Sequence, residues 1–178
     1  MPTKDTRALS NHLLRTLAAV PVSSEILDFG CGQGHHTEAF LRLGFPVHAC
    51  DPRPSAVEAT RDAVRELIGG ESVEPTVQVT SLEAIEYPDA TFDWVVAHEA
   101  ETYVSSEDDL QTLFEEGRRL LKPGGWLYVT LPASPASEEE ESPPSVSDGE
   151  AVHFSTETVE ALRKKADLAE ASAPSRVE

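Results

Sequence analysis

Short apolar runs along this chain alternate with longer segments in which apolar positions recur every three or four residues. The short runs predict buried strands at about 25–29, 46–50, 76–80, 92–97 and 126–131. The longer segments predict helices at about 33–43, 54–67 and 107–121. This alternation predicts an α/β fold, with a doubly wound, mainly parallel sheet that carries helices on both faces.

Residues 5–19, before the first strand, have the pattern of an amphipathic helix, with an apolar stripe of Leu9, Leu13, Leu14 and Leu17. The 178 residues suffice for one domain with a sizeable core. We therefore expect a single domain over 1–178, whose first 22 residues form a leading helical segment. Residues 133–152 are rich in Pro, Ser and Glu, which favours a flexible acidic linker over a lid that orders on substrate.

The most informative stretch runs from Ile26 to Gly34 and reads ILDFGCGQG. A strand that ends in an acid and three alternate glycines, and then opens a helix, predicts a cofactor pocket. Glycine lets the backbone approach a ligand where a Cβ would clash, and the helix N–H groups then face that ligand. The third glycine of the dinucleotide fingerprint G-x-G-x-x-G would fall on His35, which argues against an NAD-dependent enzyme.

Three further features follow this stretch. A second strand ends in Asp51 before Pro52, where an acid accepts hydrogen bonds from a ribose diol, although a solvated turn acid is the alternative. Residues 120–125 (LLKPGG) predict a helix end and a turn into a strand. Residues 153–157 (HFSTE) precede a helical pattern with Val159 and Leu162 on its inner side, and Ser105 or Ser106 is placed to cap the helix before 120–125.

Together these motifs resemble the class I S-adenosylmethionine-dependent methyltransferases, in particular the small-molecule, ubiquinone-biosynthesis-like subgroup, over about residues 24–168. The resemblance implies a Rossmann-like fold and S-adenosylmethionine as cofactor. It places the glycine-rich loop on the methionine end, Asp51 on the ribose, and the 81–82 pair on the adenine, where Ser81 departs from the usual Asp. The cofactor-binding residues it implies are Asp28, Gly30, Cys31, Gly32, Gln33, Gly34, Asp51, Pro52, Ser81, Leu82 and His98.

Methyl transfer from a sulfonium needs a base only if the acceptor must lose a proton. His98, Glu99 and Tyr103, after the fourth strand, are weak candidates for that role, and the catalytic residues stay unknown. We expect no metal site, because His35 and His36 point about 100° apart on a helix and no acid or cysteine completes a set. The predicted function is methyl transfer to an unidentified small molecule, and the alternative is a non-catalytic cofactor-binding or scaffold subunit.

The family fold closes with a sixth and a seventh strand. Here 168–173 is a poor candidate for the sixth and no sequence remains for the seventh. We therefore expect shortened C-terminal strands, with a truncated chain as the alternative, and either a monomer or a homodimer that covers the edge. The net charge of −18 argues against nucleic acid as a substrate and suggests a salt-rich cytoplasm.

No apolar run is long enough to span a membrane and no apolar signal core begins the chain, so we expect a cytoplasmic protein. Cys31 and Cys50 are expected to be small buried thiols.

Overall fold

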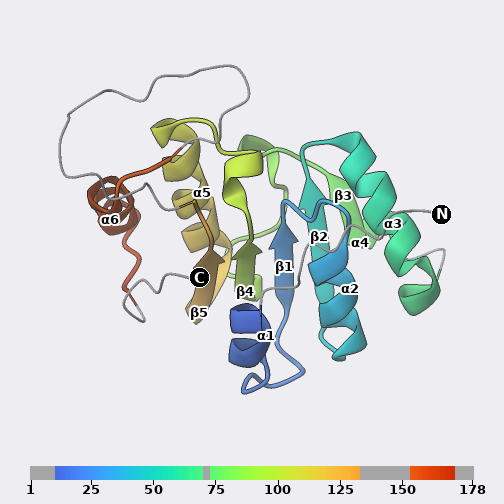
Figure 1. Ribbon diagram of the computed structural model, residues 1–178. Helices are drawn as coiled ribbons and strands as arrows, with labels where there is room; N and C mark the ends of the chain where they lie inside the picture. Colours follow the sequence, from blue (N-terminus) through green and yellow to red (C-terminus); the bar gives the residue numbers. More distant parts are fainter. Residues whose placement is uncertain (1–10, 70–72, 133–152, 171–178) are drawn as a thin grey trace.

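The computed structural model describes residues 11–69, 73–132 and 153–170, and places a five-stranded sheet at the centre (Figure 1). The strand order is β3-β2-β1-β4-β5 and every pairing is parallel, which confirms the predicted doubly wound α/β fold. The strands are β1 (Ile26–Phe29), β2 (Val47–Asp51), β3 (Val77–Val79), β4 (Phe92–Ala97) and β5 (Leu121–Val129).

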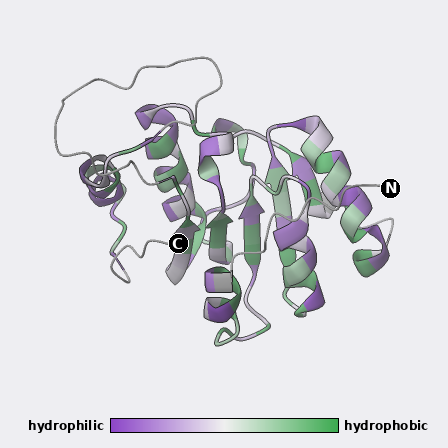
Figure 2. Cartoon of the chain, viewed as in Figure 1, coloured by the Kyte–Doolittle hydropathy of each residue, from purple (hydrophilic) through white to green (hydrophobic). Residues whose placement is uncertain are grey.

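Helices cover both faces of this sheet, and each face has its own apolar core. The side chains of β1 alternate between the cores: Ile26 packs with α1 and α2, whereas Leu27 and Phe29 pack with α5. In Figure 2 the helices carry both hydrophobic and hydrophilic residues, as amphipathic helices do. The helices are α1 (Asn11–Leu17), α2 (His35–Arg42), α3 (Pro54–Ile68), α4 (Val73–Thr76), α5 (Glu107–Leu120) and α6 (Thr156–Lys165), with short 3-10 turns η2 (Leu82–Ala84) and η3 (Ala100–Thr102).

Local signals for helix ends are confirmed where the structure describes them. The Ser106 hydroxyl accepts a hydrogen bond from the Asp109 N–H at 3.1 Å and caps α5. The Ser155 hydroxyl accepts from the Thr158 N–H at 3.0 Å and caps α6, whose Val159 and Leu162 pack against the core. Both helices therefore begin where a hydroxyl satisfies a free N–H group.

The last strand differs from the prediction. β5 begins at Leu121, five residues earlier than expected, because Leu121 pairs with Phe92 while Trp126 pairs with Trp94. Residues 122–125 therefore bulge opposite the single residue Asp93. Gly125 is required there, since a Cβ on it would lie 2.9 Å from the Asp93 carbonyl oxygen.

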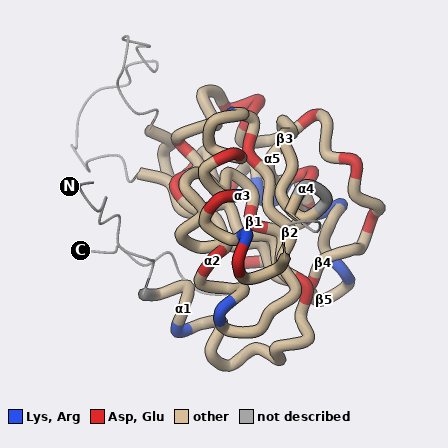
Figure 3. Tube along the Cα trace, turned by 90° about the vertical axis from the view of Figure 1, so that its right-hand side faces the viewer, with Lys and Arg blue, Asp and Glu red and all other residues tan. Residues whose placement is uncertain are grey.

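The two ends of the chain and the acidic segment lie partly or wholly outside the described residues. The leading helix is described only from Asn11, and Leu13 and Leu17 on its stripe are buried as predicted. Residues 168–170 form no strand, and the rest of the candidate sixth strand is not described. The predicted linker at 133–152 also lies outside. Acidic residues are spread over most of the described elements (Figure 3).

Candidate cofactor site

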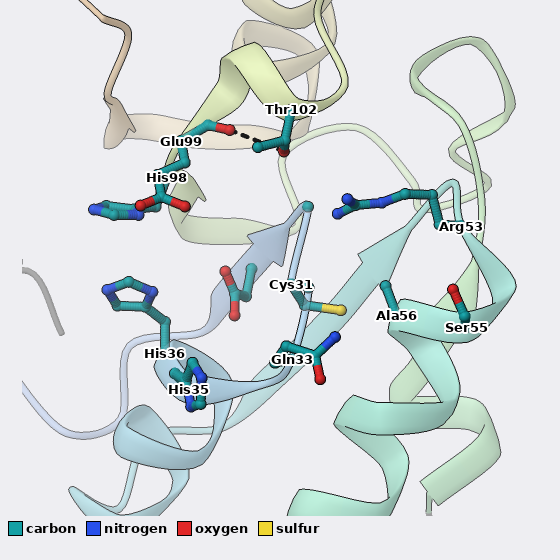
Figure 4. Close-up of a pocket in the computed structure, with 13 residues that line it drawn as sticks. Cys31, Gln33, His35, His36, Arg53, Ser55, Ala56, His98, Glu99 and Thr102 are labelled. Carbon is teal, nitrogen blue, oxygen red and sulfur yellow. Dashed lines mark hydrogen bonds between the residues drawn. The ribbon is translucent and has the colours of Figure 1, made fainter. Parts of the chain in front are cut away.

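A cavity opens at the carboxyl end of the sheet, where the chain order switches between β1 and β4. Such a switch point is where open α/β sheets bind ligands. Three loops supply its walls, after β1, β2 and β4 (Figure 4). Its lining residues are Asp28, Gly30, Cys31, Gly32, Gln33, His35, His36, Arg53, Ser55, Ala56, His98, Glu99 and Thr102.

The three alternate glycines all adopt positive φ, but they have different surroundings. A Cβ on Gly30 would lie 2.1 Å from Cε1 of Tyr103, and one on Gly34 would lie 3.0 Å from the Cα of Thr60 on α3. A Cβ on Gly32 would meet only the Gly30 carbonyl oxygen, at 3.8 Å. Gly32 therefore leaves bare backbone facing the cavity, whereas Gly34 allows α2 and α3 to pack closely and does not line the cavity.

Asp28 is a buried acid at the floor of the cavity. Its carboxylate accepts a hydrogen bond from the Thr37 hydroxyl at 2.5 Å. Burial raises the pKa of Asp28 to about 7, against the opposing effect of Thr37. A buried carboxyl with such a pKa becomes favourably ionised when a cation binds beside it.

Asp51, at the end of β2, is fully buried and accepts four hydrogen bonds. Oδ1 accepts from the backbone N–H and the Nε of Arg53, both at 2.9 Å. Oδ2 accepts from the Gly32 N–H at 3.1 Å and from an Arg53 terminal nitrogen at 2.8 Å. Burial raises the pKa of Asp51, but the bonds from Arg53 and Gly32 outweigh it and hold that pKa below its ordinary value.

Two imidazoles meet on the other side of the cavity, opposite Arg53 (Figure 4). The ring centroids of His36, from the first turn of α2, and His98, from the end of β4, are 4.4 Å apart. Burial lowers the pKa of His36 to about 4, helped by the neighbouring His98 and His35, and burial also lowers the pKa of His98. Both rings are neutral at neutral pH and can accept a proton or a hydrogen bond.

The loop after β4 is held in a rare backbone conformation. Glu99 has φ 51° and ψ 51°, a left-handed conformation that costs a non-glycine residue free energy and is often found at functional sites. The end of β5 fixes it, since the Glu99 N–H donates to the Thr130 hydroxyl at 2.7 Å. The Thr102 hydroxyl donates to the Glu99 carbonyl oxygen at 3.0 Å (Figure 4). His98 and Glu99 therefore both face the cavity on a fixed loop.

Tyr103, the third candidate base, lies elsewhere. Its ring packs edge-on against Phe29, and its hydroxyl donates to the Phe29 carbonyl oxygen at 3.3 Å. Burial raises its pKa well above the ordinary value, so the phenol stays protonated at neutral pH. Tyr103 does not line the cavity, and the structure argues against it as a base.

Ser81 and Leu82 lie beyond β3 and do not line the cavity. The Ser81 hydroxyl donates to a carboxylate oxygen of Glu83 at 3.0 Å, and Leu82 is buried in the α5 core. Pro52 also lies outside the lining. The cofactor-binding roles of these three residues stay predictions.

Sequence reasoning did not assign a role to Arg53, Ser55, Ala56 or Thr102, which also line the cavity. Three of them lie two to five residues after Asp51, at the start of α3. A helix that starts directly after a strand-end acid presents its first turn to the same sheet edge, and this signal could have found them. Among the described residues no group of three or more His, Cys, Asp or Glu side chains is placed to hold a metal ion.

Comparison with known proteins agrees with this geometry. The family described as "Methyltransferase domain" matches residues 27–129. The ubiquinone biosynthesis O-methyltransferase of Xanthomonas axonopodis pv. citri is 34% identical over 76% of this chain and 56% of its own length. The human mitochondrial protein of the same name is 36% identical over 60% of this chain and 28% of its own. A SAM-dependent methyltransferase structure from Methanosarcina mazei shares the fold, with a TM-score of 0.64 at 20% identity over 86% of this chain and 82% of its own.

The fold and the site thus define a class I, Rossmann-like methyltransferase domain. The chain belongs to the S-adenosylmethionine-dependent methyltransferase family, whose cofactor is S-adenosylmethionine. It spans about half the length of the bacterial relatives that it matches. None of the helices in the described part of the chain is long and apolar enough to cross a membrane.

Proposed function

We propose that this chain binds S-adenosylmethionine in the cavity and transfers its methyl group to a small-molecule acceptor. The observation that carries the proposal is the bare backbone of Gly32 beside the buried Asp28, at the switch point of a methyltransferase-family sheet. The cofactor brings the reactive methyl group on a sulfonium, so the protein's main task is to position the acceptor in line with it.

The residues present fit such a cofactor. Its amino-acid end carries an ammonium that suits Asp28, and a carboxylate that suits the free N–H groups at the start of α2. The absence of a side chain at Gly32 lets this end approach the loop backbone. Asp51 is buried outside the cavity lining, and its proposed role toward the ribose hydroxyls is supported by its bond to the same loop through the Gly32 N–H.

On the acceptor side we propose that His98, with His36 beside it, receives the proton of a hydroxyl acceptor. Their rings are neutral at neutral pH and only 4.4 Å apart between centroids. The relatives' printed names describe O-methylation, which requires such a proton acceptor when the hydroxyl is neutral. Glu99 lines the same wall and is the second candidate.

Calorimetry with S-adenosylmethionine and with S-adenosylhomocysteine tests the first part. Absence of binding of both near millimolar concentration would refute it. Turnover is then sought with a panel of catechols, phenols and amines. His98→Asn should lower kcat by about a hundredfold or more with a phenolic acceptor if His98 is the base. It should leave cofactor affinity unchanged, and His48→Asn, outside the cavity lining, is the matched imidazole control.

We also propose a cytoplasmic location and a monomer or homodimer. Two buried free thiols, Cys31 and Cys50, fit a reducing compartment. Within the described residues the outer edge of β5 pairs with no further strand, which favours a dimer that covers it. Light scattering across a concentration series distinguishes the two assemblies.

A further inference from the structure

The carboxylate of Asp51 has no hydrogen-bonding position left for a ligand. Two oxygens offer about four acceptor sites, and all four are used. Two of the bonds come from backbone N–H groups that the fold fixes, at Gly32 and Arg53. The other two come from the Arg53 side chain, whose guanidinium binds both oxygens at 2.8–2.9 Å. A ribose diol can therefore reach Asp51 only if that side chain leaves.

Arg53 stabilises the fold through its ion pair with the buried carboxylate of Asp51. It is the N-cap residue of α3, before Pro54, but its side chain makes no capping hydrogen bond. A cation at a helix N-terminus faces the positive end of the helix dipole, which is unfavourable. The guanidinium lines the cavity, with its side chain 47% exposed while that of Asp51 is fully buried. It can therefore swing into solvent, at the cost of its two hydrogen bonds to Asp51.

We infer that Arg53 controls access to the ribose end of the cofactor site, because its guanidinium occupies Asp51 and is exchanged for the two ribose hydroxyls when the cofactor binds. This inference rests on the proposed function. A bidentate guanidinium and a vicinal diol both present two adjacent donors, so one can replace the other on the same two oxygens. A ligand without a diol does not compensate Asp51 for the two bonds it loses.

The exchange lowers the apparent cofactor affinity of the wild-type chain. Where the binding-competent conformation is only partly populated, the dissociation constant rises by the inverse of that population. Removing the guanidinium leaves Asp51 its two backbone bonds and frees both oxygens toward the cavity. Cofactor binding should therefore tighten when Arg53 is shortened, which is the opposite of what a residue that contacts the cofactor would show.

The test compares Arg53→Ser, Arg53→Lys and Arg65→Ser with the wild type by calorimetry, using S-adenosylhomocysteine and S-adenosylmethionine. Ser is a favourable N-cap, so Arg53→Ser should preserve α3, which a thermal melt checks. Lys keeps the charge but cannot bind both oxygens in a fork. Arg65, on the same helix, pairs with exposed Asp62 among the described residues and controls for the loss of one positive charge.

We expect Arg53→Ser to bind both nucleosides about tenfold more tightly, Arg53→Lys to fall between it and the wild type, and Arg65→Ser to match the wild type. Detectable binding by Arg53→Ser without detectable binding by the wild type would also support the inference. Unchanged or weaker binding by Arg53→Ser, while the wild type binds, would overturn the inference and leave the proposed function standing. If Arg53→Ser fails to fold, Arg53→Lys decides, and wild-type affinity there would overturn the inference. Absence of binding by every variant would overturn both.

Discussion

The ring of Tyr103 lies directly on the backbone of Gly30. A Cβ at Gly30 would come within 2.1 Å of Cε1 of that ring and within 2.8 Å of two further ring carbons. The ring cannot retreat easily, because it packs against Phe29 with centroids 5.0 Å apart. The first glycine of the loop is thus required because Tyr103 leaves no room for a side chain. At Gly32, by contrast, the protein itself leaves room for a Cβ, so a ligand in the cavity is what would exclude one.

Gly30→Ala should therefore destabilise the fold itself. The overlap with Tyr103 and the φ of +74° together should cost on the order of 3 kcal/mol or more. Urea denaturation followed by circular dichroism measures the loss. Tyr103→Phe is the matched control: it loses only the hydrogen bond to the Phe29 carbonyl oxygen, about 1 kcal/mol. An alanine variant as stable as the wild type would show that the ring does not rest on Gly30.

Gly32→Ala should act on binding instead. Its new methyl group would meet no protein atom closer than 3.8 Å and would project into the cavity. We expect cofactor affinity to fall by about tenfold or more, because the methyl group would keep the cofactor from contacting the backbone at residue 32. Gly44→Ala is the control, because Gly44 also has positive φ, +92°, with open space around it and no place in the cavity lining. Equal effects of the two variants on affinity would rule out Gly32 as part of the cofactor surface.

The central strands and the position of the site could be predicted from the sequence because their signals are local. The bounds of β4 (Phe92–Ala97) agree with the prediction, and those of β1 differ by one residue, since each is a short apolar run between polar residues. β5 was predicted too short, because a bulge at 122–125 depends on pairing with Phe92, far away in the chain. The short helix α4 was not predicted either, as four residues carry no helical period.

Within the site, the sequence identifies the acid and the glycines but not their partners. That Asp51 binds Arg53 depends on how one side chain turns back over two residues. That Tyr103 fills the space above Gly30 depends on the fold of the loop after β4. Both facts arise from side-chain packing, which no residue spacing encodes, and they change the expected role of each residue.

The acidic composition leads to a prediction about salt. At a net charge of −18, the folded chain brings like charges together, and Asp and Glu recur along the described part of the tube in Figure 3. Salt screens this repulsion, with a Debye length of about 3 Å at 1 M. Potassium chloride should therefore raise the thermal midpoint by several degrees between low and molar concentrations. An isosmotic series of sucrose controls for preferential exclusion, and a flat response to salt alone would contradict the idea of a salt-rich cytoplasm.

The raised pKa of Asp28 should make the free energy of unfolding depend on pH. Burial raises the pKa of Asp28 from 3.8 to about 7 in the folded chain. A carboxyl with a raised pKa does not lower stability when the pH is below its pKa in the unfolded chain. Its destabilising effect grows as the pH rises from about 4 to about 7 and is constant at higher pH. The free energy of unfolding of the wild type minus that of Asp28→Asn should therefore fall by on the order of 2–4 kcal/mol across that window. A pH-independent difference would show that Asp28 ionises normally.

The same carboxyl should release a proton when the cofactor binds. A cation beside Asp28 favours its ionised form, so binding at about pH 6, below the folded pKa of about 7, should expel close to one proton, and binding at about pH 8.5 almost none. Calorimetry in two buffers of different ionisation enthalpy counts the protons released. Asp28→Asn still accepts the Thr37 hydrogen bond through its amide oxygen but has no proton to lose, so its binding enthalpy should not depend on the buffer. If proton release persists in Asp28→Asn, another group titrates on binding, and the result contradicts a cofactor ammonium next to Asp28.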